Sequence, residues 1–68
     1  MSDWKVFYRD SLDHDRISPS FSSKEAALVQ ARKLDRDKRA EIYKIEGPAG
    51  DIVPKADVMR WMSAHRWP

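Results

Sequence analysis

Residues 21–52 constrain the fold of this chain more than any other stretch, because they combine a capped helix pattern with a hairpin pattern. The helix pattern places four apolar side chains on one face. They are Ala27, Leu28, Ala31 and Leu34. Ser22, with Glu25 three residues later, matches a capping box and predicts the start of the helix. The apolar face fades near Asp37 or Lys38, so we expect the helix to end there.

A strand, a tight turn and a second strand follow this helix. Residues 41–45 include β-branched and aromatic side chains, which favours a strand. In residues 47–50, Pro48 suits the second position of a turn, and Gly50 can adopt a left-handed conformation. Residues 51–53 then form the returning strand of the predicted hairpin.

The chain also begins with a strand pattern. Residues 4–9 alternate, with Trp4, Val6 and Tyr8 on one face and Lys5, Phe7 and Arg9 on the other. Residues 10–15 are polar and resemble a turn. Residues 16–20 are a candidate second strand, which Pro19 would confine to a sheet edge.

A second helix is predicted at residues 55–66, opened by Pro54. Its apolar face holds Val58, Trp61, Met62 and His65. The order of elements is strand, strand, helix, strand, strand, helix. We therefore predict a single α+β domain over residues 1–68, with an antiparallel sheet of three or four strands. The first helix packs on this sheet, and the last lies beside it or across the sheet end.

Parts of this pattern resemble a family of small bacterial proteins classed as a domain of unknown function. The matching residues are Trp4 and Val6, Ser23–Ala26, Ala31 and Arg32, and Gly47, Gly50 and Ile52. The chain departs from the family in having Gly50–Asp51 where the family tends to have Asp-Gly, and in its additional C-terminal helix. The resemblance implies a fold and carries no activity with it.

Composition restricts the functional classes. The 68 residues include no cysteine, which excludes disulfides, thiolate chemistry and cysteine-ligated zinc. The N-terminus is acidic where a secretory signal needs a basic residue, and no apolar run is long enough for a membrane span. We therefore expect a cytoplasmic protein that binds no membrane. The net charge of +2 is only weakly basic.

No arrangement of residues indicates catalysis or a bound cofactor. The serines lie at turns and caps, and His65 falls on an apolar helix face, so we predict that the protein is not an enzyme. Asp13, His14 and Asp15 have metal-binding side chains, but three consecutive residues in a loop diverge, so we expect no metal site. Gly47–Gly50 has the G-x-x-G spacing of a nucleic-acid clamp, but here it joins two strands.

Two surfaces remain as candidates for binding. The favoured one is a protein interface, for self-association or for an unknown protein partner, made by Met59, Trp61 and Trp67. In a competing interpretation, Trp61 and Met62 simply close the core. The alternative function is weak nucleic-acid binding by a basic ridge on the first helix, to which Phe7 or Tyr43 would add base stacking. The ridge residues are Arg32, Lys33, Arg36 and Arg39.

Overall fold

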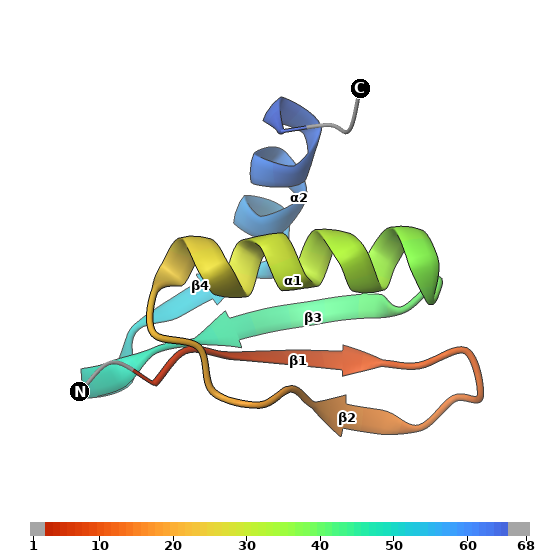
Figure 1. Cartoon of the computed structure of the whole chain (residues 1–68), viewed down its shortest axis with the longest axis horizontal. Helices are drawn as coiled ribbons and strands as arrows, with labels where there is room; N and C mark the ends of the chain where they lie inside the picture. The colour runs from red at the N-terminus through yellow and green to blue at the C-terminus, as the bar shows by residue number, and fades with distance from the viewer. Residues whose placement is uncertain (1–2, 66–68) are drawn as a thin grey trace.

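Four antiparallel strands and two helices make up the computed structural model of this protein, which describes residues 3–65 (Figure 1). In chain order the elements are β1 (Lys5–Arg9), β2 (Asp15–Ile17), α1 (Lys24–Asp37), β3 (Glu41–Glu46), β4 (Ile52–Pro54) and α2 (Lys55–Ala64). The predicted α+β class and the order of elements are confirmed. The sheet has four strands, in the order β2-β1-β3-β4.

The two long strands, β1 and β3, lie at the centre of the sheet, and the two three-residue strands lie at its edges. Phe7 on β1 is opposite Ile17 on β2 and opposite Lys44 on β3. Lys44 is in turn opposite Pro54 on β4. Residues that are opposite each other across a ladder point to the same face, so this register determines which side chains share a surface.

An irregularity in β3 breaks the simple alternation of its side chains. Phe7 pairs with Lys44, but the next residue, Tyr8, pairs with Ile42, so Tyr43 is an extra residue in the strand. Such a bulge shifts the register by one position. As a result Ile42 and Ile45, which are three residues apart, are both fully buried on the same face.

Helix α1 covers one face of the sheet with the predicted apolar stripe. Ala27, Leu28, Ala31 and Leu34 are all buried, as the pattern indicated. The predicted cap is wrong by one residue, since the cap is Ser23, whose Oγ accepts the Ala26 N–H at 3.1 Å. With Ser23 as the cap, the third helical position is Ala26 and the Ser22–Glu25 capping box does not form. The helix ends at Asp37, within the predicted limits.

Helix α2 packs beside α1 on the same side of the sheet (Figure 1). Val58 and Met62 are buried in one cluster with residues of α1, β1 and β3. The helix ends at Ala64, before the predicted end at residue 66, because the backbone of the capping residue His65 is not helical, with φ −120° and ψ 48°. Neither helix in the described part of the chain is long and apolar enough to cross a bilayer.

The edge strand β2 is shorter than predicted and begins one residue earlier. It ends at Ile17, so Pro19 lies beyond the strand. Ser18 marks the change, because it is buried and its Oγ accepts the Val6 N–H at 2.8 Å. The same hydroxyl donates to the Pro19 carbonyl at 3.0 Å. A side-chain hydroxyl therefore satisfies a backbone donor of β1 at the point where β2 turns away.

Candidate interaction surface

The face of the sheet opposite the helices carries side chains from all four strands. In the described residues, no helix covers it. We call this surface the open face. It consists of Lys5, Phe7 and Arg9 on β1, Asp15 and Ile17 on β2, Glu41, Tyr43, Lys44 and Glu46 on β3, and Ile52 and Pro54 on β4.

Large apolar side chains are exposed on the open face. Ile17 is 59% exposed, Ile52 58% and Tyr43 36%. Phe7 is half-buried between Ile17 and Lys44. Leu12, which is 73% exposed, lies in the hairpin loop outside the sheet. The exposed apolar side chains of the open face therefore come from β2, β3 and β4.

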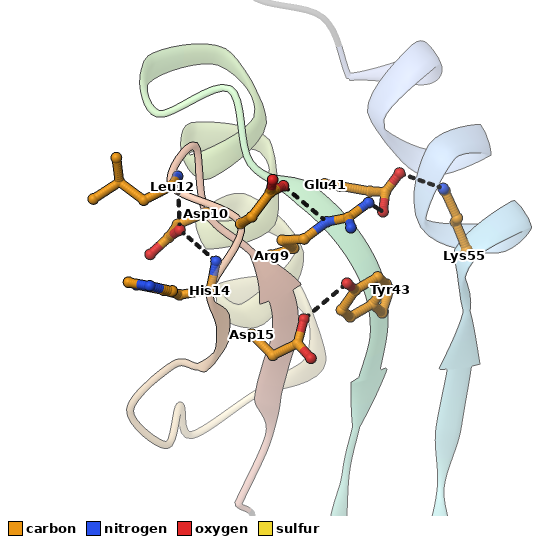
Figure 2. Close-up of polar contacts among 9 residues, drawn as sticks. Arg9, Asp10, Leu12, His14, Asp15, Glu41, Tyr43 and Lys55 are labelled. Carbon is orange, nitrogen blue, oxygen red and sulfur yellow. Dashed lines mark hydrogen bonds and ion pairs between the residues drawn. The ribbon is translucent and has the colours of Figure 1, made fainter.

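An ion-pair network crosses the open face near the β1–β2 hairpin (Figure 2). Arg9 Nη2 lies 2.8 Å from Glu41 Oε2, and Lys55 Nζ lies 3.7 Å from the other carboxylate oxygen of Glu41. Glu41 thus accepts from a strand on one side and from the start of α2 on the other. Arg9 Nε is also 3.9 Å from Asp13.

The bulged residue Tyr43 reaches across the sheet to the edge strand. Its hydroxyl donates to Asp15 Oδ1 at 2.9 Å (Figure 2). This hydrogen bond raises the pKa of Tyr43, because it holds the phenolic proton. The contact ties β3 to β2 across the intervening strand β1, where Arg9 is paired with Asp15 in the ladder.

Lys44 lies over the centre of the open face. Its Nζ is 5.0 Å from the centroid of the Phe7 ring, within the range of a cation–π contact. The same ammonium is 2.6 Å from Glu46 Oε2. The half-buried Phe7 ring is therefore bounded by a cation on one side and by Ile17 on the other.

Asp10 holds the hairpin loop in one conformation. Its Oδ1 accepts the N–H groups of Leu12 and His14, both at 2.9 Å, and its Oδ2 accepts Arg16 Nε at 2.9 Å. The His14 N–H, followed by the Arg16 and Leu12 donors, lowers the pKa of Asp10. Leu12 is therefore presented by a loop whose backbone is fixed.

The carboxylates of Asp13 and Asp15, which were considered as metal ligands, contact different partners. Asp13 lies beside Arg9, and Asp15 accepts from Tyr43. Between residues 3 and 65 no three histidine or carboxylate side chains are grouped so that they could hold a metal ion.

The residues predicted as a protein interface on the last helix pack inward to a large extent. Met59 and Trp61 are each half-buried against the core cluster. The Trp61 ring stacks on His65 with centroids 4.1 Å apart, and the Arg32 guanidinium lies 5.6 Å from the Trp61 ring centroid. Trp67 lies outside the described residues. Trp61 also lines a hollow of about 210 Å³ with Leu28, Val53 and three neighbours.

The predicted basic ridge is not a continuous helix face. Arg32 is half-buried and donates to the His65 carbonyl, and Arg36 Nε lies 2.8 Å from Asp37. Arg39 lies beyond the end of α1 with a positive φ of 52°, so the expectation that it extends the ridge along the helix is wrong. Of the four predicted ridge residues, only Lys33 and Arg36 are both exposed and on the helix itself.

The open face was only partly visible in the sequence. The alternation of β1 places Phe7 on the strand face opposite Val6, and Tyr43 was a candidate for base stacking. Ile17 and Ile52 were missed, because only the pairing of β2 and β4 with the central strands brings them to that face. The signal that both share in the sequence is an isoleucine two residues before a proline, Pro19 or Pro54.

Comparison with known proteins gives no match, whether to a family model, to a curated protein or to a solved structure.

Proposed function

We propose that this protein is a binding module without catalytic activity, and that it binds another protein molecule through the open face. The exposure of Ile17, Tyr43 and Ile52 on one uncovered face carries this proposal. Apolar side chains of this size gain about 25 cal/mol for each Å² that a partner removes from water. Aromatic residues among them are enriched at protein interfaces.

The charges on this face and at its edge favour a protein over a nucleic acid. Arg9 and Lys44 on the face, and Lys55 at the start of α2, each lie beside a carboxylate. The remaining basic residue, Lys5, is opposite Glu46 in the ladder. Phosphate binding depends on positive charge that is not already neutralised, because its free energy comes largely from counterion release. A surface of mixed charge around apolar side chains suits the polar rim and apolar centre of a protein interface.

Nucleic acid is the competing ligand. Phe7 and Tyr43 lie on the two central strands, where bases could stack on them. This alternative differs in its salt dependence, since each phosphate contact makes the affinity fall as salt rises. Binding of labelled single-stranded DNA or RNA that disappears at moderate salt and is lost in Lys44→Glu would favour it over a protein partner.

The test of the proposed function compares three forms of the protein as bait in cells that express it, followed by crosslinking and mass spectrometry. The forms are the wild type, Ile17→Ser/Ile52→Ser on the open face, and Leu12→Ser as a control that removes an exposed apolar side chain outside the sheet. We expect the wild type and the control to retain the same protein, and the double variant to lose it. Equal retention by all three, with circular dichroism showing that all are folded, would contradict a role for the open face.

A further inference from the structure

We infer that the partner on the open face is a second copy of this chain, in a symmetric dimer whose two sheets stack face to face. This inference rests on the proposed function and names its partner. The pattern of charge across the strands carries it.

Charges alternate along a row that crosses the sheet. Asp15 on β2 pairs with Arg9 on β1, and Arg9 pairs with Glu41 on β3. Lys55, at the start of α2, extends the row beyond Glu41. The row therefore reads acid, base, acid, base from one edge of the sheet to the other.

The other two rows of the open face differ in their residues, but each also places complementary groups on β1 and β3. In the middle row, Ile17 is followed by Phe7, Lys44 and Pro54. In the third row, Lys5 is followed by Glu46 and Ile52. In each row, the β1 residue has a neighbour on β3 that it attracts: Arg9 with Glu41, Phe7 with Lys44, and Lys5 with Glu46.

A twofold axis between the two sheets would bring these complementary groups of two copies together. The axis lies parallel to the strands and midway between β1 and β3. The rotation places β1 of one copy over β3 of the other and β2 over β4. Arg9 then faces Glu41 of the second copy, and Phe7 faces Lys44 of the second copy. At the edges, Asp15 faces Lys55 and Ile17 faces Pro54. Every contact occurs twice, as in the isologous interfaces of twofold dimers.

Sheet stacking of this kind is a common arrangement. Sheets pack about 10 Å apart with strand directions within about 30° of each other. The side chains at the centre, Phe7, Tyr43 and Lys44, are long enough to fill such a gap. An unrelated partner would have to supply a complementary pattern of its own, whereas a second copy already contains it.

Two single charge reversals test the dimer. In Arg9→Glu, residue 9 faces Glu41 of the second copy and repels it, and in Glu41→Arg two arginines face each other. Each variant alone is expected to dimerise roughly tenfold or more weakly than the wild type, since like charges opposed in an interface are strongly unfavourable. Mixed together, the two variants place acid over base at both sites, so the mixture is expected to dimerise again. Sedimentation of the wild type, each variant and the mixture measures this.

An intermolecular contact in the wild type tests the same geometry without substitution. Ile17 and Pro54 lie on opposite edges of the sheet, separated by β1 and β3. A nuclear Overhauser effect between them, in a sample of mixed isotope labelling, can arise only between copies. We expect this signal, together with one between Phe7 and Lys44 of different copies. Signals between copies that come from α2 instead would overturn the geometry.

The outcomes separate the inference from the proposed function. A wild type that stays monomeric at high concentration, while Ile17→Ser/Ile52→Ser still loses a captured protein, overturns the second copy and leaves the binding role. If the wild type is a monomer and the open-face variant captures the same proteins as the wild type, both the second copy and the binding role are overturned. A mixture of charge variants that fails to dimerise although each is folded overturns the twofold arrangement.

Discussion

At Gly47 the absence of a side chain leaves the space that the Trp4 ring occupies. A Cβ at this position would lie 2.5 Å from the Trp4 ring, so the indole packs directly on the glycine backbone. We expect Gly47→Ala to destabilise the protein by about 1–3 kcal/mol, the usual range for overpacking. The backbone at Gly47 is extended, with φ −118°, so conformation adds nothing to this cost. Urea denaturation measures the change.

The control for Gly47 is Gly50, where the reason for a glycine is different. Gly50 has φ +78° and no atom within 4 Å of an added Cβ. Gly50→Ala is therefore expected to cost roughly 1–2 kcal/mol through its left-handed backbone alone. Replacing Trp4 by Leu should relieve Gly47→Ala and leave Gly50→Ala unchanged. Equal relief of both would show that the Trp4 contact is not the cause.

Asp10 makes the β1–β2 hairpin sensitive to acid. Hydrogen bonds from His14, Arg16 and Leu12 hold the pKa of Asp10 below its ordinary value. Because the pKa is lower in the folded state, the stability from these bonds is present above the ordinary carboxyl pKa and is lost as the pH falls through the lowered value. We expect the amide resonances of Leu12 and His14 to shift in that acidic range. Their protection from exchange with solvent, relative to an unstructured peptide at the same pH, should also fall there.

The matched variants for this prediction are Asp10→Asn and Asp35→Asn, the latter on the exposed surface of α1. Asp10→Asn should remove the acid-dependent shift of the loop amides, and Asp35→Asn should keep it. A titration of the Leu12 and His14 amides that is the same in all three proteins would show that another group governs the loop.

At the scale of the element, the start of α1 depends on one serine. Ser23 Oγ caps the helix through the Ala26 N–H, and the neighbouring Ser22 is exposed and is not the cap residue. Ser23→Ala is expected to cost about 1 kcal/mol, and Ser22→Ala close to nothing. Thermal melts of the two variants distinguish them. If Ser22→Ala were the more destabilising variant, Ser22 would be the cap, as the sequence pattern predicts.

The sequence predicts elements well where local chemistry decides them. The stripe from Ala27 to Leu34 and the alternation of β1 depend only on neighbours in the chain, and both appear as predicted. The bulge at Tyr43 depends on how β3 pairs with β1, and no local pattern specifies it. Ile17 and Ile52 were missed for the same reason, because pairing alone brings both of them to the open face. Likewise, packing of α1 on α2 turns Arg32 toward Trp61.

At the scale of the whole molecule, one core joins both helices to the sheet. The fully buried side chains Val6, Ile42, Ile45 and Val58 come from β1, β3 and α2, and the buried stripe of α1 packs among them. Met62 closes the same cluster from the last turns of α2. The last helix is therefore part of the folding unit, and its loss would expose apolar side chains on the sheet and on α1.

This shared core predicts a single cooperative unfolding transition. The chain has three tryptophans, so each probe variant also carries Trp67→Phe. Trp4 precedes β1 and Trp61 lies on α2, so the fluorescence of Trp61→Phe/Trp67→Phe reports the sheet and that of Trp4→Phe/Trp67→Phe reports the last helix. Within each variant, we expect fluorescence and far-ultraviolet circular dichroism to give the same midpoint in urea, as two-state folding requires. Met62→Ala should lower the stability by about 2–5 kcal/mol and shift both probes together, because it opens a cavity between helix and sheet. An earlier fluorescence transition seen only in Trp4→Phe/Trp67→Phe would mean that α2 detaches while the sheet and α1 remain folded.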